Sequence, residues 1–215
     1  MRIDWNFLYS VFFISLLLPC SEAAAHPVNF KEAIAVMPGY SVNRNEIEVN
    51  YTFDTKEAFA LNFIDTDLKK GNAKFYLPQY NYKLYRKNEL ESQTNVYGML
   101  GAGVADHIDE SMFAGRAALQ ADYETRRIYT LFGAERLQSE EGVGLTSLRY
   151  RLGFAPYLAD FSGFHTWLIA QVDYTPEMHN EWTASPLLRF FYDTYLLETG
   201  FTHRGDFMVS AILHF

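Results

Sequence analysis

Cysteine, long apolar segments and net positive charge are all scarce in this sequence, and each scarcity excludes a class of protein. The single cysteine is Cys20, near the amino terminus. No stretch after residue 25 approaches the length of a transmembrane helix, so any passage through a membrane must use strands. The 18 basic residues against 26 acidic ones give a net charge of −8, which argues against nucleic acid as a partner.

The first 25 residues have the pattern of a secretory signal peptide. Arg2 gives a weakly positive start, residues 7–18 are apolar, and Ala23–Ala25 form a small-residue cleavage site. The apolar run is short for an uncleaved membrane anchor. We therefore predict cleavage after this site, which makes His26 the mature amino terminus. Proline directly precedes Cys20 and departs from the lipoprotein pattern, so the mature chain is expected to carry no lipid, disulfide or thiol chemistry.

Tyrosine and phenylalanine are abundant, with 15 and 18 residues, and they recur in segments that alternate apolar and polar side chains. A period of two is typical of β-strands. In residues 46–53, for example, Ile47, Val49, Tyr51 and Phe53 share one face opposite polar side chains. About twelve strands are predicted in this way: 34–42, 46–53, 58–64, 74–86, 96–105, 116–124, 128–137, 147–157, 164–174, 182–192, 195–202 and 207–215.

Several of these segments run for about ten residues, the length that a tilted strand needs to cross a bilayer. The mature length allows roughly sixteen residues for each strand with its connection, which suits short turns. We predict an all-β chain in which residues 34–215 form one antiparallel, up-and-down transmembrane β-barrel of about twelve strands, with ten as the nearest alternative. A short segment, 26–33, precedes the barrel. The connections opposite the termini are expected to be mostly the longer ones: 65–73, 106–113, 139–145 and 177–181.

The chain ends in an alternating strand that closes on an aromatic residue, with Phe207, Val209, Leu213 and Phe215 on one face. This strand resembles the C-terminal strand of Gram-negative outer-membrane β-barrel proteins, which typically ends in Phe or Trp and carries an assembly signal. The resemblance implies that these four residues are the assembly signal, read by the outer-membrane barrel assembly machinery. It also implies a cell outer-membrane location, contact with outer-membrane lipid, and termini that face the periplasm.

A soluble periplasmic barrel or sandwich is the lesser alternative, because it alternates in the same way but points its apolar face inward. Its other face would then meet water and be richly charged. Here that face mixes Gly, Ser, Thr, Gln and Asn with sparse charges. Sparse polar side chains suit a crowded lumen, where each charge needs a partner.

If the apolar faces meet lipid, the charged side chains gather in the lumen. Arg149, Arg151, Asp173 and Arg189 are expected to be near neighbours across adjacent strands. Two interpretations stay open: an ion- or solute-selective pore, or a network of paired charges that fills a narrow lumen. The lumen and selectivity candidates are Glu48, Arg116, Asp122, Arg149, Arg151, Asp173, Arg189 and Glu198.

A metal site at the mature amino terminus gives an alternative function. His26 would combine a free α-amine with an imidazole, a chelating pair suited to Cu(II). It resembles the N-terminal histidine of histidine-brace copper proteins, but no second histidine lies at a diagnostic spacing. The alternative is thus a periplasm-facing copper- or metal-binding outer-membrane protein.

Catalysis is not expected. Ser162 and His165 lie close in sequence, yet no hydrolase signature with a third orienting group accompanies them. The glycines of residues 96–105 precede no helix and form no phosphate loop. The sequence therefore predicts a barrel without enzymatic activity or cofactor, which acts as a narrow porin-like channel for a small ion or solute, or as a structural barrel.

Overall fold

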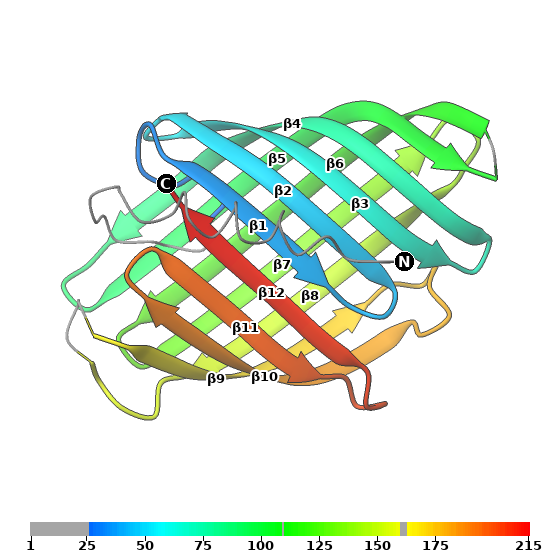
Figure 1. Ribbon diagram of the computed structural model, residues 1–215. Helices are drawn as coiled ribbons and strands as arrows, with labels where there is room; N and C mark the ends of the chain where they lie inside the picture. Colours follow the sequence, from blue (N-terminus) through cyan, green and yellow to red (C-terminus); the bar gives the residue numbers. More distant parts are fainter. Residues whose placement is uncertain (1–25, 109, 160–162) are drawn as a thin grey trace, which may run out of the picture.

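The described part of the chain folds into a closed barrel of twelve antiparallel strands (Figure 1). The computed structural model describes residues 26–108, 110–159 and 163–215; the predicted signal peptide, with Cys20, and also Ser162 lie outside the described residues. In these ranges no helix is long and apolar enough to cross a membrane. The strands are β1 (Ile34–Tyr40), β2 (Arg44–Asp54), β3 (Glu57–Leu68), β4 (Gly71–Asn88), β5 (Ser92–His107), β6 (Glu110–Thr125), β7 (Ile128–Ser139), β8 (Gly144–Phe154), β9 (His165–Tyr174), β10 (Trp182–Tyr192), β11 (Tyr195–Phe201) and β12 (Phe207–His214).

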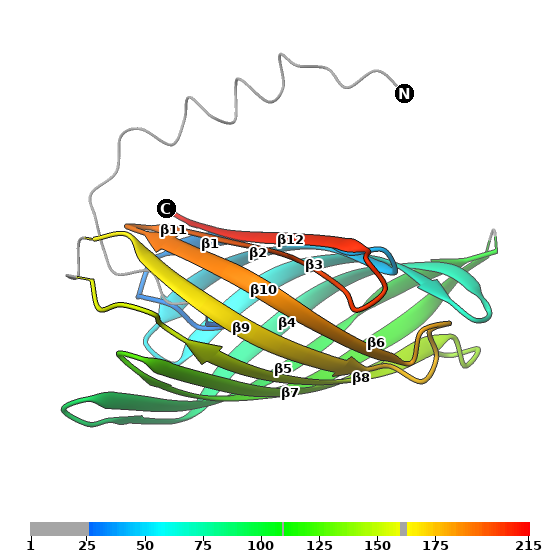
Figure 2. The same ribbon diagram turned by 90° about the horizontal axis from the view of Figure 1, so that it is seen from below.

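Each strand pairs with its neighbours in sequence, and β1 pairs with β12 to close the barrel. Closure leaves no free strand edge. A barrel in lipid needs this, because the bilayer core offers no hydrogen-bonding partners to unpaired backbone groups. Figures 1 and 2 show the strands running obliquely around one barrel. The predicted up-and-down barrel of twelve strands is confirmed. We call the end at which Ile34 and His214 lie the terminal end, and the opposite end the far end.

The distribution of polar and apolar side chains between the two faces of the barrel wall is the reverse of that in a soluble β-barrel. Outward side chains are large and apolar, such as Ile47, Phe59 and Leu61, and all three are exposed. Buried side chains on the inner face include the amides Asn62 and Gln79. The alternation predicted from the sequence is therefore confirmed with its apolar side outward, which is the arrangement of a barrel in lipid.

Several connections differ from the prediction. Residues 65–73 and 106–113 belong largely to strands, because β3 to β6 extend well beyond the expected bounds. The longest gap between strands lies at the terminal end, between Phe154 of β8 and His165 of β9. Alternation weakens at strand ends, where polar side chains occur on both faces, so the pattern understates strand length. Loop length consequently does not indicate the orientation of this barrel.

The glycines of β5 serve close strand packing. A Cβ atom on Gly103 would lie 2.0 Å from the carbonyl oxygen of Tyr76 on β4, so only glycine allows this approach. β5 continues through these glycines into the turn before β6. The prediction that they form no phosphate loop agrees with this position.

Apolar side chains fill part of the lumen at the far end. Phe75 of β4 pairs in register with Ile64 of β3 and Ala105 of β5, and all three are buried. Leu137 and Leu145 extend this cluster on β7 and β8, and Met178 joins it from the β9–β10 connection. We call these residues the far-end cluster. It narrows the far end of the lumen on the side of β3 to β8.

Candidate functional site: the barrel lumen

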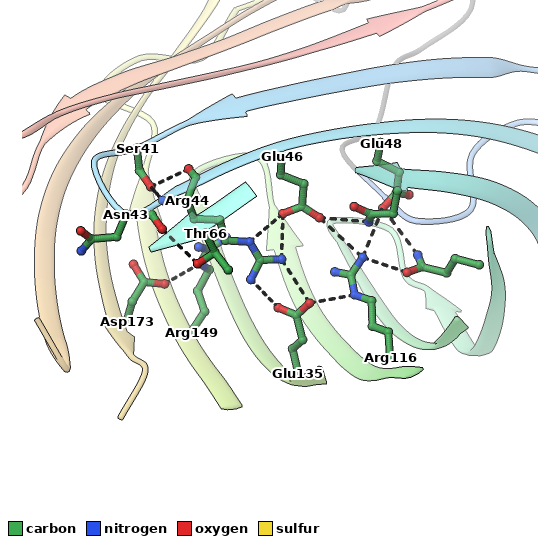
Figure 3. A network of polar contacts seen from close by, with 12 residues as sticks. Ser41, Asn43, Arg44, Glu46, Glu48, Thr66, Arg116, Glu135, Arg149 and Asp173 are labelled. Carbon is green, nitrogen blue, oxygen red and sulfur yellow. Dashed lines mark hydrogen bonds and ion pairs between the residues drawn. The ribbon is translucent and has the colours of Figure 1, made fainter. Parts of the chain in front are cut away.

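An ion-paired cluster spans the lumen between opposite walls (Figure 3). Arg44 of β2 donates from Nη1 to Glu135 Oε2 at 2.7 Å and from Nη2 to Glu135 Oε1 at 3.1 Å. Glu135 lies on β7, and β3, β4, β5 and β6 separate the two strands along the wall. Because this pair is bidentate, it fixes both side chains in one plane. It therefore bridges the lumen.

Arg116 and Glu46 complete this bridge. Arg116 Nε of β6 lies 2.8 Å from Glu135 Oε1, and Arg116 Nη1 lies 3.5 Å from Glu46 Oε1. Glu46 also accepts from Arg44 Nε at 3.1 Å. Two arginines and two glutamates thus neutralise one another in a site where isolated charges would be costly. We call Arg44, Glu46, Arg116 and Glu135 the lumen bridge.

Side-chain amides attach Glu48 to the lumen bridge. Asn62 Nδ2 donates to Glu46 Oε1 and to Glu48 Oε2, at 3.0 Å each. Arg116 Nη1 donates to Gln79 Oε1 at 2.8 Å and lies 4.0 Å from Glu48. Amide groups suit this position because they satisfy carboxylates and guanidiniums without adding charge.

A second cluster lies on the opposite side of the barrel. Glu198 of β11 accepts from Arg189 Nε of β10 at 2.7 Å and from Arg151 Nη1 of β8 at 3.1 and 3.2 Å. Ser210 of β12 donates to the same carboxylate at 3.2 Å. The Arg189 guanidinium also lies 4.5 Å from the ring centre of Tyr129, a cation–π distance. This cluster links β7, β8, β10, β11 and β12.

The remaining predicted pair lies toward the far end. Arg149 Nε donates to Asp173 Oδ1 at 2.6 Å, and the two residues are register partners on β8 and β9. The Arg149 side chain is 43% exposed, in contrast to 8% for Arg189. Arg149 is thus the cation of the candidate set that solutes at the far end can reach.

Asp122 lies apart from these clusters, toward the terminal end. It accepts from Asn95 Nδ2 at 2.7 Å, and its other oxygen lies 3.6 Å from Nδ1 of His26. The His26 ring stacks on Tyr97 with 5.5 Å between ring centres. Asp122 therefore contacts the N-terminal segment and takes no part in the pairs described above.

Residues 26–33 form a segment whose first four residues are buried in the terminal end of the lumen. The carbonyl oxygen of Pro27 accepts from Asn50 Nδ2 at 2.7 Å and from Asn81 Nδ2 at 3.1 Å. The backbone N–H of Asn29 donates to Thr52 Oγ1 at 3.1 Å, and Val28 is fully buried. The inner wall thus supplies specific donors and acceptors for this segment. We call residues 26–33 the N-terminal plug.

His26 is held as a neutral ring in this position. Burial lowers the pKa of the His26 imidazole from 6.5 to about 3, and the nearby cations Arg86, Lys83 and Arg189 add to the shift. Its 3.6 Å distance to Asp122 exceeds a hydrogen bond. Within the described residues no group of three or more His, Cys, Asp or Glu side chains is arranged to hold a metal ion. Copper binding by His26 stays a prediction.

A cavity of about 340 Å³ connects these groups along the lumen. Arg44 and Arg149 line it toward the far end, Arg116 and Arg151 line its middle, and His26 lines it at the plug. The volume falls in the range of roughly 300–1,000 Å³ that is typical of ligand sites. The lumen is therefore a charged passage that ends at the N-terminal plug.

The structure brings most predicted lumen residues into contact, and it adds partners that the sequence analysis missed. Arg151, Arg189 and Glu198 meet directly, as do Arg149 and Asp173. Glu48 and Arg116 lie at the lumen bridge. The missed residues are Arg44, Glu46, Glu135, Asn50, Asn62, Gln79 and Asn81. Glu46 shares the inward face with Glu48 and was detectable, whereas the alternation around Glu135 is ambiguous.

The predicted assembly residues lie on β12 or directly after it. Phe207 and Phe215 are exposed on the outer face, with Val209 and Leu213 partly exposed between them. Their common outward face agrees with the sequence pattern. Their role in assembly stays a prediction.

Solved structures share this architecture. The KdgM porin aligns with a TM-score of 0.51 and 10% sequence identity, over 85% of this chain and 99% of the porin. LpxR from Salmonella typhimurium aligns with a TM-score of 0.46 and 7% identity, over 85% of this chain and 99% of LpxR. No protein-family model and no curated protein matches the chain in sequence. The chain has the fold of Gram-negative outer-membrane β-barrel proteins.

Proposed function

We propose that this protein is a narrow porin-like channel of the Gram-negative outer membrane, closed at its terminal end by the N-terminal plug. The observation that carries the proposal is the charged cavity, which runs from Arg149 to the plug at His26. A lumen lined by paired arginines and carboxylates selects among ions and polar solutes by charge. The barrel shared with the KdgM porin supports the same class of function.

The proposed orientation places the termini and the plug on the periplasmic side. The terminal aromatic strand, with its resemblance to outer-membrane assembly signals, supports this direction and a requirement for the barrel assembly machinery. The far end, with the half-exposed Arg149, then faces the exterior. Solutes would enter there and meet the lumen bridge before the plug.

A structural barrel without conduction is the second candidate. The far-end cluster and the cross-lumen pair of Arg44 and Glu135 both favour it, because they fill space that an open pore would leave to water. We propose no catalytic role. His165 packs beside the ring of Phe191 at 5.9 Å, and Ser162 lies outside the described residues.

Planar-bilayer recording separates the two candidates. Refolded chains of residues 26–215 and 33–215 are compared; the shorter chain keeps Ala33, whose carbonyl oxygen accepts from the backbone of Thr52. We expect small or rare openings from the longer chain and a several-fold larger conductance from the shorter one, because removal of the plug opens the terminal end. Heat-modifiable gel migration verifies that both chains fold. Failure of both folded chains to conduct would reject the channel and leave the structural barrel.

A further inference from the structure

The seam between β1 and β12 contains a gap in its hydrogen-bonded ladder. Ile34 and Phe215 exchange both backbone bonds, at 3.0 and 2.8 Å, so they form a hydrogen-bonded pair. Such pairs recur at every second position of an antiparallel ladder. The position of Pro38 opposite Ala211 is therefore a hydrogen-bonding one, and proline has no N–H to donate. Pairing is interrupted between Val36 and Gly39 although the register stays constant.

The wall at and beside Pro38 carries small side chains. Pro38 and Ala211 present small side chains outward, and their neighbours Gly39 and Ser210 present almost nothing inward. A Cβ atom on Gly39 would have the Cβ of Ser210 as its nearest neighbour, at 3.9 Å. The other register pair inside the gap, Met37 and Ile212, lines the lumen cavity with flexible apolar side chains.

Two cavities meet at the same place. The lumen cavity of about 340 Å³ and a groove of about 470 Å³ on the outer face share seven lining residues, six of which lie on β1 and β12: Pro38, Gly39, Tyr40, Glu46, Val209, Ser210 and Ala211. The groove continues over the outer faces of β2, β3 and β4. The gap in the ladder is therefore the partition between the lumen and the bilayer.

Pro78 provides an internal comparison. It interrupts the ladder between β4 and β5 in the same way, between Tyr76 and Gln79. There, however, the strands are pressed together: a Cβ atom on Gly101 would lie 3.2 Å from the Pro78 carbonyl oxygen. Pro78 lines neither of the two cavities. Both prolines interrupt a ladder, but only the seam of β1 and β12 has a cavity on each side of its proline.

Both cavities are amphipathic. The outer groove has polar residues at its far-end rim, including Asp65 and Lys74, and apolar side chains such as Phe63 below them. This order matches a lipid in its bilayer orientation, with its headgroup at the rim and its chain along the wall. The outer groove is thus suited to an acyl chain.

The lumen side of the seam continues this character. Met37, Ile212, Leu196 and Leu187 give the cavity an apolar wall, which is unusual in a water-filled pore. Of the described residues, five arginines and four glutamates line the same cavity: Arg44, Arg116, Arg149, Arg151 and Arg189 with Glu46, Glu48, Glu135 and Glu198. Each of these arginines is ion-paired, and Arg149, whose side chain is 43% exposed, is the one that an anionic headgroup can reach.

We propose that the seam between β1 and β12 is a lateral portal, through which a single-chain anionic amphiphile passes between the bilayer and the lumen. Its hydrocarbon chain slides past Pro38 and Ala211 and settles on the apolar wall of the lumen cavity. Its carboxylate or phosphate lies among the arginines. This role is additional to conduction along the barrel axis.

The two tryptophans of the described chain allow a direct test. Trp182 faces outward, whereas Trp167 faces the lumen and packs with Leu187, which lines the cavity. With Trp182→Phe, Trp167 is the single tryptophan in a chain of residues 26–215, and excitation at the red edge of the indole band excites it selectively over tyrosine. The probe is dodecanoic acid with bromine on its terminal carbon, added to vesicles that contain the refolded protein. Bromine quenches an indole at short range, so quenching reports that the chain has entered the lumen.

A reversible lock closes the portal in the same molecules. Gly39→Cys with Ser210→Cys places two Cβ atoms about 3.9 Å apart, a separation that suits a disulfide. We expect the bromine-labelled acid to quench Trp167 in the reduced form and to lose that effect in the oxidised form. Equal quenching in both forms would mean entry through an open end of the barrel and would overturn the portal. Absence of quenching in both forms would overturn the amphiphile site itself.

A second pair of variants tests the portal without the disulfide, in case the double-cysteine variant does not fold. Pro38→Val restores the missing backbone donor opposite Ala211 and is expected to slow quenching. Pro78→Val makes the same change at the packed seam of β4 and β5 and is expected to leave the rate unchanged. The same rate change for both variants, or for neither, would count against the portal.

Discussion

At the scale of single residues, this lumen is defined by charges that are already paired. Glu135 forms ion pairs with two arginines, Arg44 at 2.7 Å and Arg116 at 2.8 Å. Removal of a shared partner is more damaging than removal of a whole pair, because it leaves charge buried without compensation. The lumen bridge therefore contributes to barrel stability as well as to the shape of the passage.

Glu135→Gln is expected to lower the free energy of unfolding by about 3 kcal/mol, since both arginines lose the carboxylate that they share and keep only Glu46 between them. It should also increase conductance through the loosened bridge. Denaturant unfolding in lipid vesicles measures the first effect. Glu91→Gln is the matched control in an exposed turn, where a change within about 0.5 kcal/mol is expected. Equal effects of the two substitutions would contradict the role of the bridge.

His26 gives plug docking a dependence on pH. Its pKa is about 3 when docked and 6.5 when free, so docking requires the neutral ring. The docking free energy has its full value above pH 6.5 and falls as the pH drops from 6.5 toward 3. In this range the undocked histidine binds a proton and the docked histidine does not. We expect the open fraction of the channel to rise on acidification through this window.

The control for this prediction is His26→Phe, which retains a ring beside Tyr97 but cannot titrate. The charged and titratable groups that face this position are unchanged in the variant: Asp122, Arg86, Lys83, Arg189 and His214. Single-channel recording at several pH values should show a weaker pH dependence than in the unsubstituted protein. An identical dependence would assign the effect to other groups.

At the scale of elements, the N-terminal plug is ordered by the wall that surrounds it. It has no regular secondary structure, and two asparagines from β2 and β4 converge on the carbonyl oxygen of Pro27. Each such bond contributes about 1 kcal/mol. A segment held by a few such bonds is the part of the proposed channel that substitutions can release.

Asn50→Ala combined with Asn81→Ala is expected to raise conductance toward that of the truncated chain, because the plug loses both donors to Pro27. The measurement is again planar-bilayer recording of the refolded protein. Asn72→Ala serves as control, since Asn72 bonds to Asp65 at the far end of the barrel, away from the plug. A double variant as closed as the unsubstituted protein would mean that these bonds do not hold the plug.

At the scale of the whole molecule, the distribution of apolar surface is that of a protein dissolved in lipid. Leu61, on the outer face of β3, is 42% exposed, yet it lies in a row of equally exposed apolar neighbours. Such a surface would be a liability in water. It is the expected surface in a bilayer, where the lumen holds the polar groups.

Leu61→Arg tests whether the apolar outer surface faces lipid. In lipid the new charge faces hydrocarbon, and we expect a loss of about 2–4 kcal/mol in the free energy of unfolding if the site lies near the bilayer centre. Leu90→Arg, at a fully exposed turn position outside the strands, should change stability by less than about 0.5 kcal/mol. Similar small effects at both positions would support a soluble barrel instead.

The sequence by itself predicted about twelve strands, their order, and the face that each residue takes wherever the alternation is clear. Those features follow from a period of two, which neighbouring residues such as Ile47 and Glu48 already express. The sequence also predicted many of the charged residues that face the lumen. In strands with clear alternation, inward-facing residues such as Arg149 and Arg151 can be recognised from that strand alone.

Only the tertiary structure decided which charges meet. Arg44 and Glu135 are 91 residues apart in sequence and come together because barrel closure brings β2 opposite β7 across a narrow lumen. Closure likewise created the cavity, the site that receives residues 26–33, and the seam at Pro38. No local pattern encodes such contacts, since each depends on the register and diameter of the complete ring of strands.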